Sequence, residues 1–146
     1  MSSNKIVDSL LGDVTLSHRF SEKHSEYEAC VSVWDREVQV VIYSNPDTGE
    51  TASAIANGRS IVQNFAQHKS TLVAHLQGDF FPKFRDNSGS DCSANDLIGE
   101  LDLQNITVHA DGNFSLGFNA CETLFDHALV VYFSKDGCVD ECDTPG

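Results

Sequence analysis

Residues 105–118 constrain the fold most, because apolar and polar side chains alternate there on both sides of a short turn. The alternating apolar positions are Ile106, Val108, Phe114, Leu116 and Phe118. A period of two is typical of a strand with one buried face, so the segment predicts a β-hairpin with Ala110-Asp111-Gly112 at its tip. A two-residue loop would set Val108 opposite Ser115 and turn the two apolar sets to opposite sides. We therefore expect a three-residue loop, with the glycine in the left-handed conformation and Val108 opposite Phe114.

A first strand over about residues 13–20 and a second hairpin are predicted in the N-terminal third of the chain. Residues 27–34 and 37–43 alternate around Asp35-Arg36, which we take as a two-residue loop. This loop sets three apolar pairs opposite one another: Val33 with Val38, Val31 with Val40, and Ala29 with Ile42. Cross-strand apolar pairs stabilise a sheet, so the pattern favours this register.

The period changes from two to helical after an Asn-Pro pair, because proline lacks an amide donor and ends the strand. Asp47 and Glu50 form a capping-box pattern, in which side chains bond the free amides at the start of a helix. The apolar stripe that follows is longer than a usual globular helix. We therefore predict two helices, at about 49–67 and 70–85, with a break near Lys69-Ser70.

The last third of the chain begins with a second capping-box pattern at Ser93 and Asp96, which predicts a short helix to about Glu100. Residues 126–134 are apolar at both odd and even positions, so we predict a strand that is buried on both faces. The residues beyond 135 are acidic and end in Pro-Gly, which is typical of a mobile tail.

These elements predict an α+β fold class. We expect an antiparallel sheet of about six strands with a helix pair packed on one face, in the order βββ-αα-α-βββ. Residues 1–146 suit a single domain, with an ordered core over about 11–135 and an acidic tail over 136–146.

The charge of the chain excludes several classes of partner. Nine Lys and Arg against 22 Asp and Glu give a formal charge of −13, which repels nucleic-acid phosphates and anionic membrane surfaces. Residues 1–14 hold one lysine and no apolar run of signal-peptide length, so we expect a soluble, cytoplasmic protein. The five cysteines are an odd number at irregular spacings and are expected to be reduced thiols.

No catalytic motif stands out, and we predict no catalytic residue, metal or cofactor. Residues 111–122 resemble a calcium loop in ligand spacing, but Leu116 occupies the position where the sharp turn requires glycine. Cys121, His127, Cys138 and Cys142 match no standard zinc spacing. His127 adjoins an apolar run and is expected to be a buried structural histidine bonded to Asp126 or a backbone carbonyl.

The acidic residues cluster near the second strand and in the tail, which favours a basic protein partner. The predicted partner-binding residues are Glu22, Glu26, Glu28, Trp34, Tyr43, Asp136, Asp140 and Glu141. The first interpretation is a small binding protein of the immunity or antitoxin kind, which masks a basic toxin-like protein. The alternative is a structural or regulatory interaction module that forms a homodimer through a sheet edge or a face with Trp34 and Tyr43. A third is an enzyme that uses His127 or a cysteine.

Five segments, in their order along the chain, also suggest a family. They are Leu11-Gly12-Asp13-Val14-Thr15-Leu16, Trp34-Asp35-Arg36-Glu37, the helical middle, Ile106-Thr107-Val108-His109-Ala110-Asp111-Gly112 and Asp126-His127-Ala128-Leu129-Val130-Val131. Over about residues 11–134 the chain resembles the bacterial domain-of-unknown-function family numbered twenty-two sixty-two. That family has no established active site, so the resemblance implies no functional residue. The acidic tail with Cys138 and Cys142 departs from the family pattern.

Overall fold

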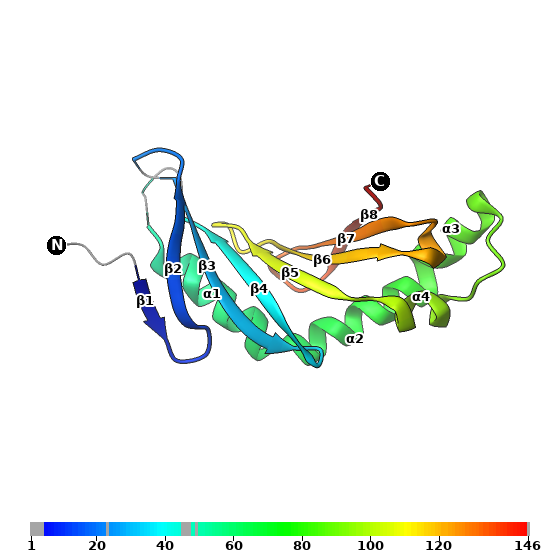
Figure 1. Ribbon diagram of the computed structural model, residues 1–146, viewed down its shortest axis with the longest axis horizontal. Coiled ribbons are helices and arrows are strands. Elements are labelled where there is room, and N and C mark those ends of the chain that lie inside the picture. Colours follow the sequence, from blue (N-terminus) through cyan, green and yellow to red (C-terminus); the bar gives the residue numbers. More distant parts are fainter. Residues whose placement is uncertain (1–4, 23, 45–47, 49, 146) are drawn as a thin grey trace.

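The structure is a computed structural model that describes residues 5–22, 24–44, 48 and 50–145. Its strands form one eight-stranded sheet, and a long helical segment runs along one side of that sheet (Figure 1). The first four strands are β1 (Lys5–Asp8), β2 (Gly12–Arg19), β3 (Ser25–Val33) and β4 (Arg36–Tyr43). The helical elements are α1 (Ala52–Gln63), α2 (Phe65–His75), the π-helix η1 (Leu76–Phe80), α3 (Phe81–Ser88) and α4 (Ala94–Glu100). The remaining elements are β5 (Leu103–Val108), β6 (Phe114–Cys121), the 3₁₀-helix η2 (Glu122–Leu124), β7 (His127–Phe133) and β8 (Val139–Asp143).

The strands lie in chain order from β1 to β8, and each neighbouring pair is antiparallel except β4 and β5. The helical segment joins β4 to β5 and crosses back along the sheet, so these two strands run in the same direction. The predicted six-stranded antiparallel sheet in the order βββ-αα-α-βββ is therefore wrong. The sheet is mixed and has eight strands, and the chain is an α+β protein with two antiparallel blocks around the helices.

Two edge strands account for the difference in strand number. β1 pairs with β2, with Ile6 opposite Val14, and β8 pairs with β7, with Cys142 opposite Val131. β8 lies inside the segment that was predicted to be a mobile tail. Both strands are short, and three of the five residues of β8 are carboxylates, so side-chain alternation gives little signal. β1 and β8 are instead held in the sheet by backbone hydrogen bonds to a neighbouring strand.

The two predicted hairpins have different outcomes. The β5–β6 hairpin has the predicted register, with Val108 opposite Phe114, and Gly112 at its turn has a φ of 93°. The register predicted for β3–β4 is wrong, because Trp34 and Asp35 form the turn with φ values of 55° and 59°. Both central residues of a type I′ turn have positive φ, and that turn follows the twist of a hairpin.

The shift in the β3–β4 register is two residues, so it preserves the alternation between the two faces of the sheet. The observed apolar pairs are Val31 with Val38, Ala29 with Val40, and Tyr27 with Ile42. Asp tolerates the left-handed conformation and Trp34 adopts it as well. Arg36, predicted to lie in the loop, instead starts β4 and reaches Asp102 in an ion pair.

The helical segment differs from the prediction at its start and at its break. α1 begins at Ala52, so Glu50 lies before the helix, and Asp47 falls outside the described residues. The break lies at Asn64 and not at Lys69-Ser70, which is inside α2. The Asn64 side-chain amide donates to the Ser60 carbonyl at 2.9 Å, and a side chain that bonds the backbone in this way competes with a continuous helix.

The second capping box is present as predicted. The Ser93 hydroxyl accepts from the Asp96 amide at 3.1 Å, and the Asp96 carboxylate accepts from the Ser93 amide at 2.8 Å. α4 therefore starts at Ala94 and ends at Glu100. A cap of this kind is local to one turn, which explains why the sequence pattern was sufficient.

The core lies between the sheet and the helical segment. One row of residues in register crosses six strands on this side: Ala29, Val40, Ile106, Leu116, Val131 and Cys142. Its four central members are fully buried, and helix residues Ile55 and Leu72 belong to the same core. Burying one such aliphatic side chain contributes about 1.5–3 kcal/mol, so this row holds the two halves of the sheet to the helices.

Candidate functional site

The helical segment lies along one face of the sheet and leaves the other face uncovered (Figure 1). One register row crosses it from β2 to β8: Thr15, Glu28, Val41, Thr107, Ser115, Tyr132 and Glu141. We call the surface that includes this row the open sheet face. β7 shows the effect of the missing cover, because Leu129 is buried while Tyr132 is 38% exposed. The prediction that this strand is buried on both faces is therefore wrong.

The open sheet face is strongly acidic. Alternation along the strands places the following carboxylates on it: Asp13, Glu26, Glu28, Glu37, Glu141 and Asp143. Lys5 contributes a positive charge, and its Nζ lies 3.3 Å from Asp13 Oδ2. Carboxylates that share one surface add their fields, so this face attracts cationic groups and repels anionic ones.

Aromatic and histidine rings gather at one end of the open sheet face. Phe20 lies 5.3 Å from His18 and 5.0 Å from His24, measured between ring centroids, and it is 52% exposed. The Tyr43 ring stacks on His109 at 5.8 Å with an interplanar angle of 10°. Rings of this kind are common anchors in protein interfaces, because they bury a large area with few rotatable bonds.

Glu26 lies between this ring cluster and the other carboxylates of the open sheet face. Its carboxylate accepts from the Ser17 hydroxyl at 2.8 Å and lies beside the Tyr43 hydroxyl. Burial, and then the neighbouring Glu26 carboxylate, raise the pKa of Tyr43. Tyr43 is therefore a neutral hydrogen-bonding ring and not an acid-base group at neutral pH.

The structure brings some of the predicted partner-binding residues together and separates others. Those on the open sheet face are Glu26, Glu28, Tyr43 and Glu141. Trp34 lies on the helix side, where its ring meets Phe118 edge-on at 5.5 Å and Lys69 Nζ sits 4.5 Å above it. Glu22 lies in the β2–β3 loop, and Asp136 and Asp140 border two separate cavities.

Asp13, Glu37 and Asp143 are the carboxylates of this face that sequence reasoning missed. Asp13 and Glu37 have the correct parity relative to Glu28 once the hairpin register is known. Asp143 had no such signal, because β8 was not recognised as a strand.

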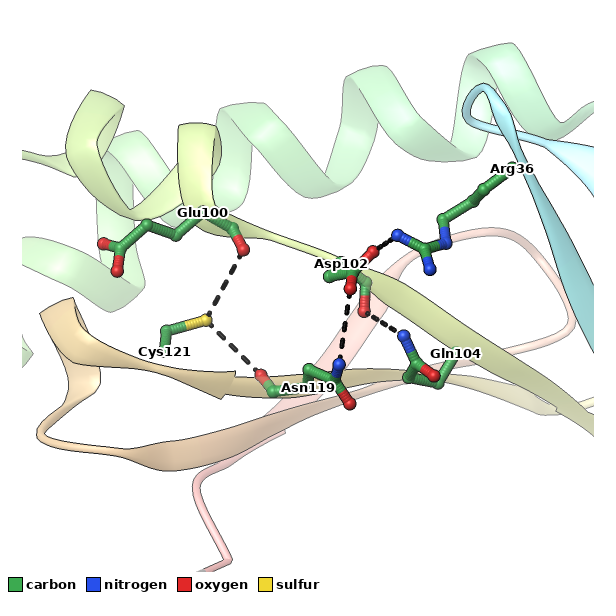
Figure 2. Close-up of polar contacts among 6 residues, drawn as sticks. All are labelled: Arg36, Glu100, Asp102, Gln104, Asn119 and Cys121. Atoms are coloured by element: carbon green, nitrogen blue, oxygen red, sulfur yellow. Dashed lines mark hydrogen bonds and ion pairs between the residues drawn. The ribbon is translucent and has the colours of Figure 1, made fainter.

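A polar network lies around the start of β5 and is structural in character. Figure 2 shows the Asp102 carboxylate between the Arg36 guanidinium and the Asn119 side chain, whose Nδ2 donates to it at 3.3 Å. The Cys121 thiol donates to the Asn119 carbonyl at 3.4 Å. Burial, and then the Glu100 carboxylate, raise the pKa of this thiol, which makes it a poor nucleophile. The network ties the β3–β4 turn to β5 and β6.

The residues considered for catalysis or metal binding do not assemble into a centre. His127 is exposed at the start of β7, so the prediction of a buried structural histidine is wrong. It follows Phe125 and Asp126, which have φ values of 54° and 65° and turn the chain at the end of the sheet. Across the described residues, no three His, Cys, Asp or Glu side chains are placed to hold a metal ion.

A small polar pocket of about 290 Å³ lies where α1 and α2 meet the turns after β5 and β7. Asn57, Asn64 and Lys135 line it, together with His68, whose ring packs 4.9 Å from Phe114. Burial lowers the pKa of His68, so this side chain is neutral at neutral pH. The pocket is amide-rich, and it also has the Ser60 and Thr71 hydroxyls and the Asp136 carboxylate. None of these three groups forms a hydrogen bond or ion pair with His68 among the described residues, so no nucleophile and base pair is assembled.

The fold and the site define an α+β protein whose single mixed sheet has one helix-covered face and one open, acidic face. No protein-family model, no curated protein and no solved structure matches this chain. The resemblance to the family numbered twenty-two sixty-two therefore stays a prediction. Within the part of the chain that the structure describes, no helix is both long and apolar enough to cross a membrane.

Proposed function

We propose that this protein is a small binding protein whose open sheet face covers a basic protein partner, in the manner of an immunity or antitoxin protein. The observation that carries the proposal is the helix-free sheet face, whose described strand residues include six carboxylates and one lysine, Lys5, which already lies close to Asp13. Complementary charge steers two proteins together and excludes partners of the wrong sign.

The composition of the face also supports a protein partner. Half-buried Val41 and Val130 lie between the carboxylates, and Tyr43 and Phe20 stand at one end. An apolar centre with a polar rim and aromatic anchors is the usual anatomy of a protein interface. A rigid sheet presents these groups without a large ordering cost on binding.

The alternative functions have weaker support. The homodimer interpretation relied on a sheet edge or on a shared face with Trp34 and Tyr43, and the second route is weakened because these side chains lie on opposite sides of the sheet. In a homodimer, the open sheet faces of the two copies would also repel each other, because both are acidic. The enzyme interpretation relied on His127 or a cysteine, and burial raises the pKa of Cys121 and Cys142.

The proposal is tested by capture of basic proteins from the source cell on the immobilised protein at about 50 mM salt. One variant combines Glu28→Gln, Glu37→Gln and Asp143→Asn on the open sheet face. A matched control removes the same charge elsewhere with Asp86→Asn and Asp91→Asn, both near the end of α3, together with a third change, Asp126→Asn.

We expect the wild type and the control to retain the same basic protein, and the face variant to bind it at least about tenfold more weakly. Raising the salt should weaken all three complexes, because exposed charges are screened. Retention of no basic protein at low salt would overturn the proposal. Equal binding by the two variants would show that the open sheet face is not the interface.

A further inference from the structure

A cavity of about 500 Å³ lies between the helical segment and β8, away from the ring cluster of the open sheet face. Asp79, Phe80 and Phe84 line it from the helical side, and Asp140, Glu141 and Cys142 line it from β8. Its volume falls within the range of about 300–1,000 Å³ that is usual for small-molecule sites. This cavity could not be predicted from residue patterns, because neither β8 nor η1 was predicted.

The π-helix η1 forms the helical wall. A π-helical turn inserts an extra residue into a helix, and such turns are frequent at functional sites. Asp79 lies in this turn, with its carboxylate 2.8 Å from Lys83 Nζ and 3.4 Å from His75 Nε2. Lys83 is therefore already engaged by a carboxylate of the cavity.

The apolar wall is a set of phenylalanine rings. Phe80 and Phe84 are stacked, with centroids 5.9 Å apart and an interplanar angle of 21°. Phe84 also lies 5.8 Å from Phe81, which is buried in the core, and 5.9 Å from Phe125, which is 57% exposed. The rings thus run from the core to the surface and hold the Phe84 side chain in a defined position.

The wall from β8 is acidic. Burial, and then the Asp79 and Glu141 carboxylates, raise the pKa of Cys142 to about 11. The thiol is neutral at neutral pH, so it offers neither a nucleophile nor a metal ligand. Asp140 and Glu141 form no ion pair among the described residues. Asp140 therefore lines the cavity without a Lys or Arg ion-pair partner among the described residues.

We propose that this cavity binds a small organic cation, namely a protonated amine joined to an apolar, ring-sized body. The amine would meet the carboxylate of Asp140, where a charge-assisted hydrogen bond is strong. The apolar body would lie against the Phe80 and Phe84 rings, whose faces attract both apolar surface and positive charge. An anion of the same shape is repelled, because the carboxylates of Asp79 and Asp140 outnumber Lys83.

Three probes separate the parts of this ligand: tryptamine has the amine and the ring, indole-3-propionate replaces the amine by a carboxylate, and ethylamine lacks the ring. Binding is measured on the full chain by calorimetry and by amide shifts in NMR spectra. We expect tryptamine to bind at least about tenfold more tightly than either other probe. The amide shifts should be confined to η1, α3 and β8.

Two variants and a control complete the test. The change Asp140→Asn and the change Phe84→Leu should each weaken tryptamine binding by at least about fivefold, and Phe84→Leu preserves apolar packing so that folding is retained. The control Glu22→Gln removes equal charge in the β2–β3 loop, far from the cavity, and should leave binding unchanged.

No tryptamine binding at millimolar concentration, or equal binding of the anionic probe, would overturn this proposal. Tryptamine binding that survives both variants would do the same. The result is separate from the partner-binding proposal, because the face variant leaves Asp79, Phe84 and Asp140 unchanged.

Discussion

Asp8 provides the sharpest test of how β1 is attached to the fold. Its carboxylate is almost fully buried, with 2% of the side chain exposed, and the Arg59 guanidinium of α1 donates to its Oδ1. The Leu10 and Leu11 amides donate to its Oδ2 at 3.0 and 2.9 Å. The change Asp8→Asn preserves the size of the side chain and removes its charge, so it tests the ion pair and the turn together.

The expected loss of stability in Asp8→Asn follows from the pKa of the Asp8 carboxyl group. The hydrogen bond from Arg59 is the main reason that the pKa of Asp8 falls from 3.8 to about 2, and the Leu11 and Leu10 amides add to the effect against the cost of burial. At about 1.36 kcal/mol for each unit of pKa, this difference corresponds to about 2.4 kcal/mol. The Arg59 side chain is 43% exposed, and solvent screening weakens such a pair, so we expect about 1–2 kcal/mol.

The assay is urea unfolding of the wild type and the Asp8→Asn variant. With a slope of about 2 kcal/mol per M, the variant should lose about 0.5–1 M in its midpoint at about pH 7. The folded-state pKa lies below the unfolded value, so the carboxylate stabilises the fold fully above about pH 5. This contribution is lost as the pH falls toward about 2, where the two proteins should converge.

Asp13→Asn is the matched control. Asp13 of β2 forms an ion pair with Lys5 of β1, but its side chain is 62% exposed. We expect it to cost less than about 1 kcal/mol. Equal costs for the two variants, or an Asp8 effect that does not vary with pH, would refute the placement of β1 against α1.

Three further predictions concern stability and thiol chemistry. Gly112→Ala should destabilise the protein by about 1–3 kcal/mol in urea unfolding, because Gly112 has a φ of 93° and an added Cβ would lie 3.1 Å from the Cβ of Lys135. Gly99→Ala is the control: an added Cβ on α4 would lie in open space, so this variant should be neutral or slightly stabilising. Burial lowers the pKa of His68 in the folded protein, so the imidazole of the unfolded chain is protonated first as the pH drops. The free energy of unfolding should therefore fall below about pH 6.5, and it should fall less in the His68→Leu variant. Iodoacetamide at about pH 8 should label exposed Cys138 well before Cys142, whose pKa is raised to about 11, and equal rates by mass spectrometry would contradict the packing of β8.

Local interactions explain which elements were predictable. The β5–β6 register depends on one glycine and on alternation within a single hairpin, and the start of α4 depends on two side chains in one turn. In β3–β4 the face was predictable from alternation, but the register was not, because Trp34 adopts a left-handed conformation that bulky residues seldom take. Glu28 and Tyr43 share the open sheet face for the same reason, since strand parity is local, whereas Glu141 lies there only because β8 joins the sheet.

Residue patterns alone were enough to predict the hairpin at residues 105–118, the capped helix before it and the acidic character of the chain. The folded chain was needed to show that β4 and β5 run parallel, that β1 and β8 extend the sheet, and that one face has no helix over it. The difference comes from the range of the interactions involved. Turns and caps are made by residues a few positions apart, whereas β4 meets β5 only after the helices have packed, and edge strands are held by backbone bonds that side-chain patterns do not encode.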